Sequence, residues 1–294
     1  MKNAIEVNNL TKKHKNFLLD NVSFNVPNGF ICGFIGQNGA GKTTTMKLIL
    51  NMALKDSGEI KILDKSSDDI SVKEHLGVLL DQPYFHESWT AIDVEKAMCP
   101  FYKSWDSNAY HQYLQQFSLN PNQKFKTLSR GMKMKLGMAT ALSHNARLLL
   151  LDEPTSGLDP IMRDEMLGIL RDYMALEERS VFFSTHITSD LEKIADFIVY
   201  IHRGQIIYSG LKDELTEKYC LIRGGKDDLP SGKRQKILGF VEHPGGFEGM
   251  IDVSHVGGFP STVIMESATL EDIMVHINRE GNKEGNFSFG GESI

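Results

Sequence analysis

A run from Gly36 to Thr43 has the spacing GxxxxGK[ST] and is the strongest chemical signal in the chain. Its glycines allow a tight turn, so that successive backbone N–H groups can point at one phosphate. Lys42 would reach the outer phosphates of a nucleotide, and the Thr43 hydroxyl would bind Mg²⁺. The helix that follows would direct its positive end at the same place. The predicted nucleotide contacts of this run are Gly36, Asn38, Gly39, Ala40, Gly41, Lys42, Thr43 and Thr44.

The elements beside this run have the types that such a site requires. Residues 30–35 predict a buried strand, and residues 44–52 predict a helix. A second apolar strand, Leu148–Leu151, ends in Asp152 and Glu153. The first carboxylate can hold Mg²⁺ through water, and the second can polarise an attacking water molecule. Asp152 is therefore a predicted metal ligand, and Glu153 is the predicted general base.

Strands and helices alternate along the first two thirds of the chain, which predicts an α/β fold with a parallel sheet between helices. Residues of about 84–146 are mostly helical in pattern and predict an inserted helical subdomain. After about residue 218 glycine becomes frequent and the strands become short. We expect residues 1–218 to form one domain and 219–294 a small C-terminal α+β domain with a flexible tail. This domain could serve dimerisation, docking or regulation.

Composition excludes several classes of protein. The formal net charge of −6 does not suggest a nucleic-acid partner. The three cysteines lack the spacing of a metal site, which fits a reducing compartment. No apolar run approaches the roughly 20 residues that cross a bilayer. Any membrane role is therefore expected to come through a partner.

The five residues from Leu128 to Met132 read LSRGM and open a predicted helix. This motif resembles the signature LSGGQ of the ATP-binding cassette (ABC) family, with Arg130 and Met132 as departures from it. In that family the signature binds the γ-phosphate of an ATP molecule held by a second cassette. The resemblance therefore implies that Ser129 and Gly131 contact nucleotide across a dimer.

Further family positions follow in sequence order. Gln82 ends a strand, where the family glutamine contacts Mg²⁺ and water. Asp159 lies in a stretch, 156–159, that resembles the loop crossing the dimer interface, and His186 resembles the histidine that contacts the γ-phosphate. The family's aromatic contact to adenine falls on either His14 or Phe17, and the sequence does not decide between them. The resemblance thus gives catalytic roles to Glu153, His186, Gln82 and Lys42, and metal ligands at Thr43, Gln82 and Asp152.

The resemblance covers about residues 3–218 and implies the P-loop ABC cassette fold, with a parallel core, an antiparallel β subdomain and a helical subdomain. It implies an ATPase that uses ATP and Mg²⁺, works as a dimer of cassettes and drives an integral membrane permease from the cytoplasmic face of the membrane. Arg130, Met132 and the single cassette most resemble bacterial exporters of the ABC-2 kind, similar to the Ytr-type and phenol-soluble modulin exporter ATPases. Peptides or other amphipathic compounds are the expected cargo. The alternative is an ABC ATPase that acts on the ribosome or on DNA. For the transporter ATPase that we favour, we expect no nucleic-acid partner.

Overall fold

The computed structural model describes residues 2–81, 85–176 and 178–281. Within these residues the chain forms two compact units. The first contains the chain up to Ile187 together with Val199–Ile206, and the second contains Thr188–Ile198 and the chain from Ile207 onward. The predicted domain boundary near residue 218 stays a prediction.

A six-stranded sheet forms the centre of the fold, with the strand order β10-β9-β3-β8-β7-β6. The strands are β3 (Ile31–Ile35), β6 (Leu76–Leu79), β7 (Leu148–Asp152), β8 (Ser180–Thr185), β9 (Phe197–His202) and β10 (Gln205–Leu211). Strands β3, β8, β7 and β6 pair in parallel. Every residue of β3, β7 and β8 is buried, which explains the apolar runs in these strands. The predicted parallel core is confirmed.

A second sheet in the first unit is antiparallel and has the order β2-β1-β4-β5. Its strands are β1 (Asn3–His14), β2 (Phe17–Pro27), β4 (Ser57–Ile62) and β5 (Lys65–Ser66). The hairpin of β1 and β2 extends to the pair His14 and Phe17. Asn9 has a φ of 50° at a register shift in β1, so a bulge bends this strand.

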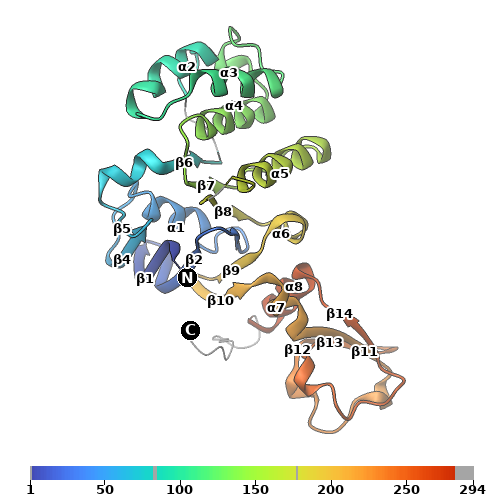
Figure 1. Cartoon of the computed structure of the whole chain (residues 1–294). Helices are drawn as coiled ribbons and strands as arrows, with labels where there is room; N and C mark the ends of the chain where they lie inside the picture. The colour runs from blue at the N-terminus through green and yellow to red at the C-terminus, as the bar shows by residue number, and fades with distance from the viewer. Residues whose placement is uncertain (1, 82–84, 177, 282–294) are drawn as a thin grey trace. The chain divides into compact units, whose positions relative to one another are not determined.

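Helices of the first unit follow the sheet strands or lie in the predicted insertion. They are α1 (Lys42–Ile49), α2 (Ala91–Met98), α3 (Ser107–Gln116), α4 (Arg130–Leu142) and α5 (Pro160–Met174), with short 3₁₀ turns at Ile70–His75, Cys99–Phe101 and Phe125–Thr127. Helices α2 and α3 pack on α4, which itself packs on β6 (Figure 1). Helix α2 begins at a capping box between Thr90 and Asp93.

Two aromatic residues, Phe85 and Trp89, lie in the segment before α2. The ring of Phe85 meets that of Phe125 edge-on, with 5.7 Å between the centroids. Phe125 lies on the 3₁₀ turn before α4 and is buried. This contact favours a packing role for Phe85.

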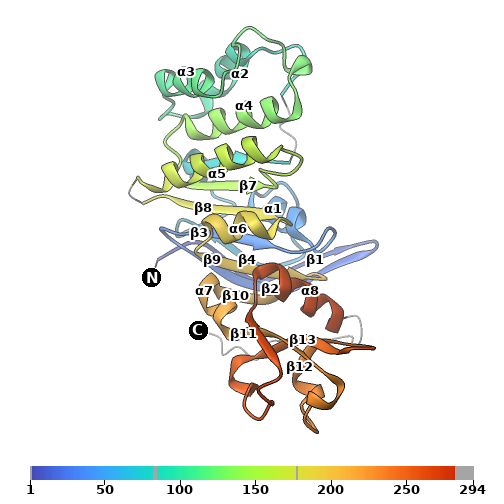
Figure 2. The same cartoon turned by 90° about the vertical axis from the view of Figure 1, so that its right-hand side faces the viewer.

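The second unit contains an antiparallel sheet with the order β12-β13-β11-β14. Its elements are α6 (Thr188–Ile194), α7 (Lys212–Lys218), β11 (Tyr219–Gly224), β12 (Ile237–His243), β13 (Gly246–Asp252), β14 (Ile264–Ser267) and α8 (Leu270–Gly281), with 3₁₀ turns at Lys226–Asp228, Arg234–Lys236 and Val253–His255. Helix α8 packs on β12 and on α6 (Figure 2). Ile222, Phe247 and Ile251 are central to the apolar core. The predicted α+β character of the C-terminal part is confirmed, and its predicted flexible tail lies outside the described residues from 282 onward.

No helix in the described ranges combines the length and the apolar character that crossing a bilayer requires.

Candidate nucleotide site

The loop between β3 and α1 has the backbone of a phosphate-binding turn. Gly39 and Gly41 have φ angles of 81° and 116°, a region that glycine enters at little cost. A Cβ on Gly36 would lie 2.5 Å from the carbonyl oxygen of Ile201, which is closer than any side chain allows. The backbone conformation therefore favours glycine at positions 39 and 41, whereas the close approach of Ile201 requires it at position 36. The turn ends where Thr45 N–H donates to the Gly41 oxygen at 2.8 Å and starts α1.

Lys42, the first residue of α1, turns its side chain back into this loop. Its Nζ donates to the carbonyl oxygen of Gly36 at 2.7 Å and to that of Gln37 at 3.3 Å. The same nitrogen lies 3.3 Å from Oε1 of Glu153. Only 6% of the residue is exposed. A buried cation is thus held at the centre of the loop, where phosphate charge would be neutralised.

The two acidic residues at the carboxyl end of β7, Asp152 and Glu153, occupy different environments. Asp152 is buried and accepts a hydrogen bond from the Ser184 hydroxyl on β8. Glu153 has a φ of 52°, a conformation that costs free energy in a residue with a side chain. Its N–H donates to both the backbone oxygen and the hydroxyl of Ser184, each at 3.1 Å. Strand β8 therefore holds the bend that turns the Glu153 carboxylate into the pocket.

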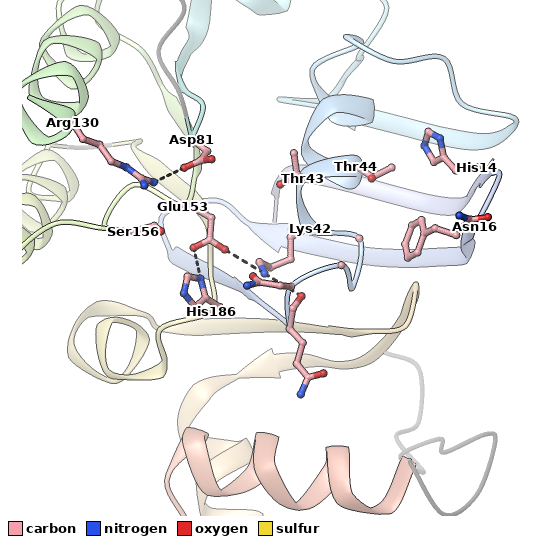
Figure 3. Close-up of a pocket in the computed structure, with 15 residues that line it drawn as sticks. His14, Asn16, Lys42, Thr43, Thr44, Asp81, Arg130, Glu153, Ser156 and His186 are labelled. Atoms are coloured by element: carbon pink, nitrogen blue, oxygen red, sulfur yellow. Dashed lines mark hydrogen bonds and ion pairs between the residues drawn. The ribbon is translucent and has the colours of Figure 1, made fainter. Parts of the chain in front are cut away.

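His186 follows β8 and completes a contact chain across the pocket. Its Nδ1 lies 2.8 Å from Oε2 of Glu153, while Oε1 of the same carboxylate faces Lys42 (Figure 3). The Glu153 side chain is 12% exposed and that of His186 is 41% exposed. A carboxylate held in this way is accessible to water and can accept a proton. The arrangement is therefore suited to activating water beside a phosphate.

The two candidate adenine contacts lie on the same wall of the pocket. His14 and Phe17 pair across the end of the β1–β2 hairpin, and both line the pocket together with Asn16 (Figure 3 labels His14 and Asn16). His14 is exposed, whereas Phe17 is half-buried. The Phe17 ring lies against Gly41, since a Cβ there would be 2.8 Å from its Cζ. Both rings remain candidates.

The predicted dimer contacts lie elsewhere on the first unit. Ser129 caps α4 by accepting from the Met132 N–H at 3.3 Å. Gly131 is buried, and a Cβ on it would meet the end of the Met162 side chain. Asp159 caps α5 by accepting from two backbone N–H groups at 3.0 Å. None of these three lines the pocket of Lys42, as far as the described residues define its wall. Gln82 lies outside the described residues.

Side chains on the phosphate loop and at the carboxyl end of β7 are candidates for holding Mg²⁺. Within the described ranges, no group of three or more His, Cys, Asp or Glu side chains could hold a metal by itself. Mg²⁺ is commonly bound through one or two carboxylates together with substrate phosphates and water. Thr43, on the pocket wall, and the Asp152 carboxylate offer such a set. These residues fit Mg²⁺ that arrives with a nucleotide.

Several pocket residues were not singled out as contacts by the sequence. They are Asn16, Gln37, Asp81, Arg130 and Ser156, of which Gln37, Arg130 and Ser156 belong to recognised motifs. Asp81 follows β6 closely, at the carboxyl edge of the parallel sheet where ligands bind in such folds. The position of Asp81 after a sheet strand could therefore have identified it from the sequence. Arg130 could be recognised only as a departure from the family signature, which does not show that it lines the pocket.

Parallel strands with a phosphate loop after β3 and an acidic pair at the carboxyl end of β7 define a P-loop protein that binds nucleoside triphosphates. The protein-family model described as ABC transporter matches residues 19–156 of the chain. The chain is 33% identical over 223 residues to the bacitracin transport ATP-binding protein BcrA of Bacillus licheniformis, covering 74% of this chain and 73% of that protein. It is 34% identical over 206 residues to the lantibiotic transport ATP-binding protein SrtF of Streptococcus pyogenes, covering 69% and 89%. The chain belongs to the ABC transporter family, as an ATP-binding cassette with ATPase activity.

Solved structures are similar to the same part of the chain. One, described as the ATP-binding subunit of an ABC transporter, has a TM-score of 0.66 and 25% identity, and it matches 72% of this chain and 91% of that one. Another, an ATP-binding cassette bound to ADP and phosphate, has a TM-score of 0.63 at 23% identity and matches 70% and 98%. The predicted ABC cassette fold is confirmed.

Proposed function

We propose that this ATPase drives export of peptides or other amphipathic antimicrobial compounds through a separate membrane subunit. The observation that carries the ATPase part is the Glu153 carboxylate, which contacts both Lys42 and His186 in one pocket. The cargo class is supported by the two relatives above, whose names state transport of bacitracin and of a lantibiotic. The similarity to both exceeds 30% identity.

Three side chains of the pocket, those of Glu153, Lys42 and His186, have roles in this proposal. Glu153 accepts a proton from the water that attacks the γ-phosphate. Lys42 stabilises the charge on the transferred phosphoryl group. His186 contacts the second oxygen of Glu153 and so orients the carboxylate, and the family resemblance adds a contact from His186 to the γ-phosphate.

Magnesium is part of the same proposal. Thr43 and Asp152 would hold the ion, and the family resemblance adds Gln82. Bound with ATP, Mg²⁺ supplies positive charge to the phosphate oxygens.

A second cassette and a membrane subunit are the proposed partners, which would hold the chain at the cytoplasmic face of the membrane. The family resemblance of the motifs that contain Ser129, Gly131 and Asp159 supports a role for these residues toward an ATP molecule on a second cassette, either a copy or a related chain. The remaining alternative, action on ribosomes or DNA, finds no support in a net charge of −6.

The adenine contact can be assigned by substitution. We expect Phe17→Ala to weaken ATP binding by about fivefold to a hundredfold, because stacking on a base contributes about 1–3 kcal/mol. His14→Ala should have a smaller effect, because this residue is exposed and Phe17 lies against the phosphate loop. Calorimetric titration with ATP and with inorganic triphosphate measures both.

Only the ATP titration should change, since triphosphate has no base to stack. Leu18→Ala is the matched control, because Leu18 is exposed and adjacent to Phe17. A larger loss of ATP binding in His14→Ala than in Phe17→Ala would assign the stacking ring to His14 instead.

The transporter reading is tested by purification from native membranes. A tagged chain, extracted in mild detergent, should recover a polytopic membrane protein in stoichiometric amount, identified by mass spectrometry. An untagged strain processed in parallel is the control. Recovery of ribosomal or DNA-associated proteins, with no membrane protein, would favour the alternative function.

A further inference from the structure

The third residue of the signature motif, Arg130, reaches into the nucleotide pocket. It is the first residue of α4, and its Nη2 donates to Oδ1 of Asp81 at 2.9 Å (Figure 3). The two side chains are 52% and 46% exposed. The pocket wall that Arg130 and Asp81 form also contains Lys42 and Glu153. A guanidinium therefore faces the same cavity as the proposed phosphate site.

The guanidinium also lies against the turn that contains Ser156 and Gly157. A Cβ on Gly157 would be 3.0 Å from Nη1 of Arg130 and 3.1 Å from its Cζ. Gly157 has a φ of 71°, so this position favours glycine twice, by conformation and by space. Two other segments, namely the residues just after β6 and this turn, thus contact the one positive charge at the start of α4.

The contact with Asp81 leaves the cation available for a stronger partner. Ion pairs between half-exposed side chains contribute little to stability. A guanidinium carries five N–H donors in a planar fork, and this fork matches phosphate as well as carboxylate. A triphosphate carries more charge than one carboxylate, so it can compete with Asp81 for Arg130.

We propose that Arg130 is a phosphate-binding residue for ATP, and that Asp81 holds its guanidinium in place until a phosphate displaces the carboxylate. This rests on the ATP site proposed above. The phosphate belongs to ATP on the same chain or to ATP on a second copy, and the chemistry is the same. Substitution of Arg130 should weaken ATP binding, because Arg130 binds the phosphate. Substitution of Asp81 should strengthen ATP binding, because Asp81 competes with the phosphate for Arg130.

The test measures the dissociation constant of ATP with Mg²⁺ by calorimetry, and the half-saturating ATP concentration for hydrolysis. We expect Arg130→Gln to raise both by about tenfold or more, since a charge-assisted hydrogen bond is lost. Both values for Arg130→Lys should lie between those of Arg130→Gln and those of the unmodified chain, because the charge remains and the planar guanidinium is lost. Asp81→Asn should lower both values by a few fold.

Controls separate this role from a structural one. Arg171→Gln, at an exposed position near the end of α5, removes the same charge away from the pocket and should change neither value. Raising the salt concentration should weaken ATP binding more in the unmodified chain than in Arg130→Gln. Thermal unfolding shows whether each variant is folded.

A mixing experiment identifies which ATP molecule is bound. A Lys42→Ala chain still carries Arg130, so its addition to the Arg130→Gln chain should restore hydrolysis at low ATP if the contact crosses to a second copy. Unchanged hydrolysis assigns the contact to the same chain.

Two results would overturn the proposal. One is an unchanged affinity in Arg130→Gln. The other is equal weakening by Arg130→Gln and Asp81→Asn, which would leave only a structural ion pair. Binding of ATP without hydrolysis in the unmodified chain would instead overturn the proposed function, and the affinities would still test Arg130.

Discussion

Glu153→Gln is expected to lower the rate of ATP hydrolysis by about 10²- to 10⁴-fold, the range for loss of a general base. ATP binding should remain, and it should not become weaker. The substitution keeps the size of the side chain but removes the charge that now faces Lys42 at 3.3 Å. Without that carboxylate, the Lys42 ammonium is more available to phosphate. Phosphate release and calorimetric titration measure the two effects.

Glu59→Gln is a matched control, because Glu59 is exposed on β4. It should hydrolyse ATP at the rate of the unmodified chain. Full turnover in Glu153→Gln would remove Glu153 from the role of general base, and His186 would then be the next side chain to test in the same pocket.

The phosphate loop and its flanking elements could be predicted because local signals agree there. An apolar run, a glycine-rich turn and a helix follow one another, and each is specified by its own residues. The same holds for β7, where Leu148–Leu151 are all fully buried and directly precede the acidic pair. The roles assigned to these site residues stay predictions, which the substitutions above test.

Contacts between distant segments could not be read from the sequence. Arg130 and Asp81 are 49 positions apart, and their pairing depends on how α4 packs against β6. The same is true of Gly36, whose need for a glycine comes from Ile201 on β9. The left-handed φ of Glu153 also depends on a remote partner, Ser184 on β8.

The C-terminal sheet illustrates a different limit. Its strand β14 (Ile264–Ser267) is exposed at all four positions and pairs with β11, more than forty positions earlier, so no alternation of buried residues marks it. An exposed edge strand gives no periodic signal in the sequence. Composition could predict an α+β unit here but not the strand order.

Lys42→Ala is expected to have the opposite effect on binding to Glu153→Gln. The ammonium is buried and bonded to the Gly36 and Gln37 oxygens, so its removal leaves the Glu153 carboxylate without this cation. That carboxylate would then repel a triphosphate. We expect ATP affinity to fall by at least about tenfold to a hundredfold, since charge-assisted hydrogen bonds contribute about 1.5–3 kcal/mol each. Calorimetric titration with ATP checks this.

The double variant Lys42→Ala/Glu153→Gln separates attraction from repulsion. It should bind ATP more tightly than Lys42→Ala alone, because the unpaired carboxylate is gone. Lys47→Ala is the control, since Lys47 is exposed on the same helix and its loss should leave binding unchanged. If the double variant binds no better than Lys42→Ala, the Glu153 charge does not act on the phosphate, and the loss comes only from the missing ammonium.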